Sequence, residues 1–187
     1  MGTTIRILAV SGSARRDSLN RKLLAVAVDA TRHAGAEVTL VDLNEFELPL
    51  YHGDLEEAQG LPANATRLIE LIAQHHGLLI ASPEYNSMIT PLLKNTIDWC
   101  TRADDNPFEG RIAAVVSASP GALGGVRSLK MAQSLLQHLG CVIVPGNTML
   151  PQAHKAFDGD GKLLDVRTQK SVDALATRLV ETARKLA

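Results

Sequence analysis

The regular alternation of short apolar runs with segments of helical periodicity constrains the fold more than any other feature. Five apolar runs have the length and composition of strands, and they cover residues 5–10, 38–43, 77–82, 112–117 and 141–144. Apolar residues at helical spacing mark the segments between and after them, at residues 19–30, 63–75, 91–99, 126–139 and 167–186. This alternation predicts a doubly wound α/β fold, with a mostly parallel sheet and helices on both faces.

The connections between the strands narrow the topology further. Parallel neighbours need crossover connections, and because these are right-handed, they favour the flavodoxin-like strand order 2-1-3-4-5. The chain has 187 residues, of which 45% are hydrophobic, and this is enough for one compact domain with a sizeable core. No repeat, linker or low-complexity segment divides it. We therefore expect residues 1–187 to form a single domain.

Charge and cysteine content argue against several classes of protein. The formal net charge is −1, so no general electrostatic attraction draws the chain to nucleic acid or to an anionic membrane. Cys100 and Cys141 lack metal-binding or redox spacing, which fits a reducing compartment. The apolar run at residues 5–10 is too short for a signal peptide, and no run approaches the roughly 20 residues of a membrane helix. We expect a cytoplasmic protein.

A polar loop directly follows the first apolar run and leads into the first predicted helix. It reads Gly12-Ser13-Ala14-Arg15-Arg16-Asp17-Ser18-Leu19-Asn20. The first turn of a helix leaves N–H groups without partners, and the helix dipole adds positive potential there. Two hydroxyls, an amide and two guanidinium groups beside these N–H groups suit a phosphate monoester. The alternative is an ordinary connection between a strand and a helix, with a serine or aspartate cap.

The residues absent from this loop narrow the kind of phosphate ligand. A dinucleotide-binding turn has the pattern G-x-G-x-x-G, whereas only Gly12 is present here, and Asp42 at the end of the second predicted strand does not compensate. The pattern G-x-x-x-x-G-K-[ST] is also missing from the chain. Hydroxyl and guanidinium side chains in place of glycines indicate a single terminal phosphate.

Two further loops should meet this one, because ligands of open α/β sheets bind outside the carboxyl ends of the strands. The loop at residues 83–90 carries Tyr85, one of six aromatic residues in the chain. A tyrosine ring can lie against a planar heterocycle whose edge the backbone amides of residues 84–86 contact. The loop at residues 117–125 is rich in glycine, so a flat ligand can approach its main chain. The alternatives are a tyrosine at the surface rim and glycines that serve tight turns.

Three motifs together resemble the NADPH-dependent FMN reductase family. They are Gly12-Ser13-x-Arg15-x-x-Ser18-x-Asn20, Pro83-Glu84-Tyr85-Asn86 and Leu93-Lys94-Asn95-Thr96-Ile97-Asp98-Trp99, and the similarity runs over most of the chain. The resemblance implies a flavodoxin-like fold, bound FMN, NAD(P)H as co-substrate and assembly as a homodimer or homotetramer. It further implies reduction of a small-molecule electron acceptor, which is a quinone, an azo dye or a metal oxyanion such as chromate.

The resemblance also implies roles for individual residues. Ser13, Arg15, Ser18 and Asn20 would hold the FMN phosphate, residues 83–86 would cradle the flavin ring, and Ser117 would line the pocket. The full set of expected cofactor-binding residues is Gly12, Ser13, Arg15, Ser18, Leu19, Asn20, Pro83, Glu84, Tyr85, Asn86 and Ser117. Because the flavin carries the chemistry, no catalytic side chain is expected. Met88 stands where many relatives have a small hydroxyl residue, and its effect on the choice of acceptor is open.

Other chemistries find no support in the sequence. The six histidines form no H-x-x-x-H or H-E-x-x-H pair, so we expect no metal site, and the G-x-S-x-G motif of α/β-hydrolases is absent. Residues 158–162 resemble the start of a calcium loop, but Lys162 stands where a ligand is needed, which predicts a β-turn. Two alternatives to a reductase remain. One is a flavodoxin-type FMN electron carrier, which is usually more acidic, and the other is a flavin-binding regulatory module without NAD(P)H turnover.

Overall fold

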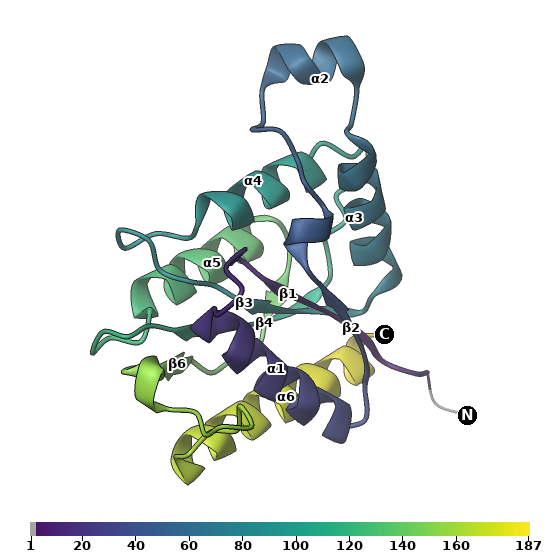
Figure 1. Ribbon diagram of the computed structural model, residues 1–187. Helices are drawn as coiled ribbons and strands as arrows, with labels where there is room; N and C mark the ends of the chain where they lie inside the picture. Colours follow the sequence, from purple (N-terminus) through teal and green to yellow (C-terminus); the bar gives the residue numbers. More distant parts are fainter. Residues whose placement is uncertain (1–2) are drawn as a thin grey trace.

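A parallel sheet forms the centre of the computed structural model, which describes residues 3–187 (Figure 1). Its strands are β1 (Arg6–Ser11), β2 (Glu37–Val41), β3 (Gly77–Ala81), β4 (Ile112–Ala118), β5 (Val142–Ile143) and β6 (Thr148–Leu150). The strand order is β2-β1-β3-β4-β5, β6 also pairs with β4, and every pairing is parallel. The predicted fold class and strand order are therefore confirmed.

The fifth position of the sheet differs from the single strand predicted over residues 141–144. Two short strands share this position, because β5 pairs with Ile112 and Ala113 of β4 while β6 pairs with residues 116–118. Pro145 and Gly146 lie between them, and Gly146 has a φ of 131°. Proline has no N–H for the ladder and glycine weakens a strand, so the strand breaks here and resumes at β6.

Helices cover both faces of the sheet. They are α1 (Leu19–His33), α2 (Gly53–Gln59), α3 (Ala63–Gln74), α4 (Pro91–Cys100), α5 (Val126–His138) and α6 (Val166–Leu186), with 3-10 helices η1 (Leu43–Glu45) and η2 (Ala153–Lys155). One hydrophobic cluster packs α1 and α6 on the sheet, and a second packs α3, α4 and α5 on the other face (Figure 1). Leu79 of β3 enters the first cluster, and Leu78 and Ile80 enter the second. Burial on both faces explains why this strand is apolar throughout.

Helix α4 begins as the sequence predicts. Thr90 is the N-cap, its hydroxyl accepts the Leu93 N–H, and Pro91 occupies the first helical position. The Thr90 hydroxyl also donates to the Gly12 carbonyl at 2.6 Å. One side chain therefore starts α4 and fixes the loop after β1 beside it.

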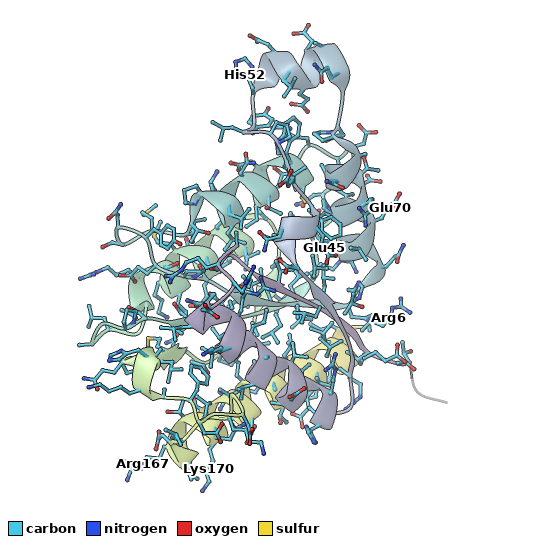
Figure 2. The ribbon with its side chains drawn as sticks, in the orientation of Figure 1. Arg6, Glu45, His52, Glu70, Arg167 and Lys170 are labelled. Carbon is cyan, nitrogen blue, oxygen red and sulfur yellow. The ribbon has the colours of Figure 1, made fainter. Side chains whose placement is uncertain are left out.

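Helix α2 lies between the predicted strand at residues 38–43 and the predicted helix at residues 63–75, in a stretch for which the sequence predicts no regular element. It projects away from the sheet (Figure 1) and buries none of its residues. His52, the residue before this helix, lies on the projection and far from the sheet (Figure 2). A helix with no buried face has no apolar periodicity, which is why the sequence does not indicate it.

The loop before α2 is fixed to α4 by two residues of the third sequence motif. The Asn95 amide and the Trp99 indole both donate to the Pro49 carbonyl, at 2.9 and 2.7 Å. The Asn95 side-chain oxygen accepts the Tyr51 N–H at 2.8 Å. Trp99 is fully buried within the chain, so this motif holds the long connection between β2 and α3 against the body of the protein.

The turn predicted at residues 158–162 is present. The Asp158 carboxylate accepts the N–H groups of Asp160 and Lys162, and Phe157 and Leu163 form an antiparallel bridge beside it. Within residues 3–187, no helix is long and apolar enough to cross a membrane. The same residues contain no group of three His, Cys, Asp or Glu side chains that could hold a metal ion.

Candidate functional site

Three loops at the carboxyl edge of the sheet enclose a pocket of about 370 Å³. The first loop follows β1, the second follows β3 and the third follows β4. These strands are neighbours in the sheet, and so the loops meet as the sequence predicts. The lining residues are Ser13, Arg15, Asp17, Ser18, Leu19, Asn20, Pro83, Glu84, Tyr85, Ala118, Ser119 and Pro120. Most of the expected cofactor-binding residues are among them. Gly12, Asn86 and Ser117 do not line the pocket.

The N-terminus of α1 is open at this pocket. Ser18 is the N-cap of the helix, and its hydroxyl accepts the Arg21 N–H at 3.3 Å. The N–H groups of Leu19 and Asn20 find no acceptor in the part of the chain that the structure describes. Arg15 lines the pocket and has no ion-pair partner among residues 3–187. These donors and the positive end of the helix dipole form a site for an anion.

Ser13 and Gly12 shape the loop that carries these donors. The buried Ser13 hydroxyl accepts the Arg15 N–H at 3.3 Å. A Cβ at Gly12 would lie 3.0 Å from the Leu93 Cβ and 3.2 Å from the Pro83 Cδ. Gly12 therefore lies behind the pocket wall, where its small size lets the first loop approach α4 and the second loop closely.

The Asn20 side chain is bonded within the protein. It is buried, its Nδ2 donates to the Ala118 carbonyl at 2.8 Å, and its Oδ1 accepts the Ala118 N–H at 2.9 Å. The side-chain amide that is expected to contact a phosphate thus joins α1 to the end of β4, and the Asn20 backbone N–H stays open to the pocket. Sequence reasoning missed this bond because the two partners are 98 positions apart.

Glu84 caps α5 from the second loop. Gly125, the N-cap of α5, provides no side-chain bond, and the Glu84 carboxylate accepts the N–H groups of Arg127 at 2.9 Å and Ser128 at 3.1 Å. The Arg127 guanidinium lies 3.4 Å from the other carboxylate oxygen. The Val126 N–H bonds within the preceding turn. All first-turn donors of α5 are therefore satisfied, in contrast to those of α1.

Three buried serines fix the second loop behind the pocket. Ser117 Oγ donates to the Ser82 carbonyl at 2.6 Å. The Ser82 and Ser128 hydroxyls are 2.7 Å apart, and the Ser128 hydroxyl donates to the Pro83 carbonyl at 2.7 Å. A Cβ at Gly125, where φ is 82°, would overlap the Ser117 hydroxyl. Ser117 is fully buried, so it holds the loop from behind instead of lining the pocket as expected.

Tyr85 and Met88 close a tight turn at the rim of the pocket. Each N–H bonds to the carbonyl of the other residue at 3.0 Å. Asn86 and Ser87 between them have φ values of 52° and 68°, as in a type I′ turn. Tyr85 is 48% exposed and also lines the pocket, so it is both a wall residue and a rim residue. Asn86 lies at the tip of the turn.

A smaller hollow of about 160 Å³ lies beside the first loop, between α1 and β2. Arg21 and Asp42 form an ion pair at 2.6 Å on its wall. Burial raises the pKa of Asp42, but hydrogen bonds from Asn44 and Arg21 and the charge of Arg21 outweigh this and hold the pKa below its usual value. Ser11 Oγ is buried on the same wall and has no partner within residues 3–187.

A larger hollow lies away from the three loops. It has a volume of about 670 Å³ and lies between α1, α6 and the turn at residues 160–162. Lys22, Asp29, Lys162 and Asp173 are among its lining residues. Because cations and carboxylates are mixed on its wall, it gathers no set of donors for one ligand, and the pocket at the carboxyl edge remains the candidate site.

Comparison with known proteins gives a consistent result. Residues 5–155 match a family model described as NADPH-dependent FMN reductase. The NAD(P)H-dependent FMN reductase of Pseudomonas aeruginosa is 34% identical and covers 100% of this chain and 99% of that protein. A quinone reductase of Escherichia coli is 31% identical over 77% of this chain and 76% of its own length. The solved structure of FerB, a flavoenzyme NAD(P)H:(acceptor) oxidoreductase from Paracoccus denitrificans, has a TM-score of 0.84 and 31% identity and covers 97% of this chain and 98% of its own.

Proposed function

The chain belongs to the NADPH-dependent FMN reductase family, and we propose that it passes reducing equivalents from NAD(P)H through FMN to a quinone-class acceptor. It is an NAD(P)H-dependent oxidoreductase with FMN as its cofactor. The observation that carries the proposal is the open N-terminus of α1, in a pocket that extends to Tyr85. Several relatives are named as quinone reductases. Azo dyes and metal oxyanions are further candidate acceptors.

The residues of the pocket fit FMN. Donors of the first loop match the oxygens and the charge of the phosphate; they are the N–H groups of Leu19 and Asn20, the hydroxyls of Ser13 and Ser18, and the Arg15 guanidinium. The main chain of residues 83–85 and the Tyr85 ring would contact the flavin ring. When bound, FMN supplies the hydride-transfer chemistry.

The overall reaction balances without an acid or base from the chain. NAD(P)H gives up one hydride, solvent supplies one proton, and the quinone takes up two electrons and two protons to become a hydroquinone. The side chains therefore have to bind the reactants and hold them in position. Glu84 and the bonded hydroxyls of Ser82, Ser117 and Ser128 serve this purpose by fixing the second loop.

The proposal also covers the organisation and location of the protein. We expect residues 1–187 to act as a single FMN-binding domain, in the cytoplasm, as a homodimer or homotetramer. The expectation of assembly comes from the resemblance to the family. The net charge of −1 gives no reason for nucleic-acid or membrane partners. Light scattering coupled to size-exclusion chromatography gives the molar mass of the assembly and tests this expectation.

The first test is an absorbance spectrum of the purified protein, repeated without oxygen after addition of NADPH and then of NADH. A yellow protein that bleaches with a nicotinamide donor and regains its colour with a quinone supports the reductase. A yellow protein that resists both donors favours an electron carrier or a regulatory module. A colourless protein that takes up no added FMN overturns the assignment of the pocket to a flavin.

A further inference from the structure

Tyr85 and Met88 stand directly opposite each other in an antiparallel pair. Their reciprocal bonds of 3.0 Å define this register. Opposite residues of antiparallel strands place their side chains on the same face, with Cβ atoms about 5 Å apart. The phenol ring and the thioether therefore leave the turn on the same face, and we call the Tyr85/Met88 pair the rim platform.

The backbone of the rim platform is held in an unusual conformation. Asn86 and Ser87 have positive φ values of 52° and 68°, which residues with a Cβ adopt rarely. Such a conformation persists where the surrounding structure determines it, and it is common at ligand sites. Glu84 bonds to the N-terminus of α5, and the Pro83 carbonyl accepts the Ser128 hydroxyl. The two residues before the turn, Pro83 and Glu84, are therefore fixed to α5.

The rim platform presents apolar surface beside the pocket. Tyr85 is 48% exposed and Met88 is 49% exposed. Since Tyr85 also lines the pocket, the platform continues the pocket wall toward solvent. Residues 83–93 include no Lys or Arg, and Arg127, which approaches this loop, is paired with Glu84. An anion finds no free positive charge on this segment, whereas an uncharged planar ring finds apolar surface.

We propose that the rim platform receives the planar ring of an uncharged, quinone-type acceptor, and that Met88 determines the preference for such acceptors over compact oxyanions such as chromate. This inference rests on the proposed function, because it names the acceptor of the same site. A quinone ring buries apolar surface against the thioether and the phenol. Chromate has no apolar surface to bury and gains nothing from Met88.

The test compares two acceptors in matched variants of the FMN-loaded protein. Met88→Ser removes the thioether, Met88→Leu restores an apolar side chain of similar size, and Met131→Ser changes a methionine of similar exposure, 42%, on α5. With Met88→Ser, kcat/KM for a water-soluble naphthoquinone should fall about tenfold, the scale of one lost apolar group in a binding site. The same constant for chromate should change less than about twofold, and Met88→Leu should recover most of the loss.

A binding measurement gives a readout that does not depend on turnover. The protein is labelled with carbon-13 at the methionine methyl groups, and the naphthoquinone is added to the oxidised, FMN-loaded form without a donor. The proposal expects the Met88 methyl signal to shift with quinone concentration, because an aromatic ring lies against it. The Met131 methyl signal should stay in place.

Each outcome decides a separate question. If the unmodified protein reduces neither acceptor with either donor, the proposed function is wrong, and the methyl signals still decide whether the platform binds a quinone ring. If the protein reduces quinones but Met88→Ser changes both acceptors equally, or raises the KM of NADPH alone, the role of Met88 in acceptor choice is wrong. If the chemical shift of the Met88 methyl group does not change when the quinone is added, the rim platform does not bind a quinone ring.

Discussion

Asn20 and Ala118 hold each other by two hydrogen bonds, one in each direction, across 98 positions of the chain. The amide of Asn20 occupies the place that a neighbouring strand would take at the end of β4. Because Asn20 belongs to the first turn of α1, these two bonds join the anion site to the third loop. Damage to this link should therefore affect the whole pocket.

We expect Asn20→Asp to lower the free energy of unfolding by about 3 kcal/mol, because the buried carboxylate cannot donate to the Ala118 carbonyl. Burial raises the pKa of the introduced carboxyl, so the native state takes up a proton at a higher pH than the unfolded state does. The loss of free energy of unfolding should therefore shrink as the pH falls toward 4. Urea unfolding at several pH values measures this. Asn64→Asp, which changes an amide whose bond to the Glu47 carbonyl is exposed, is the control. An equal loss in both variants would contradict the structural link.

Arg15→Ala should weaken FMN binding by about 1.5–3 kcal/mol, because it removes a charge-assisted contact with the phosphate. Riboflavin, which lacks the phosphate, should bind the variant and the unmodified protein equally well. Flavin fluorescence titrations of the apoprotein measure both affinities. Arg16→Ala is the matched control, since Arg16 does not line the pocket. If Arg15→Ala leaves the FMN affinity unchanged, Arg15 does not hold the phosphate.

Glu84→Ala should expose the amides of Arg127 and Ser128 to exchange and lower the free energy of unfolding by about 1–2 kcal/mol, the usual effect of a lost helix cap. Hydrogen exchange resolved along the chain measures the opening of α5 and of the loop at residues 83–88. Arg127→Ala should change little by comparison, because the carboxylate still accepts both backbone N–H groups. Slow exchange at both amides in Glu84→Ala would show that the cap is not needed.

The two thiols should be unreactive in the native protein. Burial raises the pKa of Cys100 and of Cys141 to about 12, so at pH 8 only about one thiol in ten thousand is the nucleophilic thiolate. A chromogenic disulfide reagent should label the native protein only at the rate of unfolding, and both thiols should react at once in denaturant. Rapid labelling of the native protein would contradict the burial of these side chains.

The Arg21–Asp42 pair should contribute to stability only above acidic pH. The pKa of Asp42 is lower in the folded protein than its usual value, so its contribution is present above the unfolded pKa near 4 and is lost as the pH falls through the folded pKa. Asp42→Asn should cost about 1 kcal/mol or less at pH 7, because the pair is partly exposed. The cost should shrink at acidic pH, once the pH has fallen below the folded pKa and the carboxyl of Asp42 is protonated. Asp29→Asn, in a more exposed pair, is the control, and an equal cost for Asp42→Asn at neutral and at acidic pH would refute this role.

The strand order and the meeting of the three loops could be predicted because they depend on local patterns. A buried strand is apolar along its length, as β3 is, and Thr90 and Pro91 mark a helix start within two residues. The split at Pro145 and Gly146 was missed, although both residues are visible in the sequence, because a short apolar run before them is also compatible with a single strand.

The roles of several pocket residues could not be predicted, because their partners lie far away in the chain. An asparagine at position 20 suits both a contact with a phosphate and a bond to the backbone of Ala118, so the residue type alone does not distinguish the two roles. Glu84 is 43 positions from the Arg127 N–H that it accepts. Ser117 was expected in the pocket, and only the packing of β4 shows that its hydroxyl turns toward Ser82. The motifs at residues 12–20 and 83–86 located the loops correctly, while the direction of each side chain is seen only in the structure.

The N-terminus of α5 has its N–H groups bonded, whereas that of α1 has open N–H groups, and this difference gives the pocket at the carboxyl edge a direction. Glu84 has already neutralised the positive end of α5, so in the pocket lined by the three loops an elongated ligand with one anionic tail meets open helix N–H groups at α1. Such a ligand has one way in: its tail goes to Leu19 and Asn20, and its other end is left at Tyr85. A molecule inserted the other way round would bring its charge to the turn at residues 85–88, which has no cation to receive it.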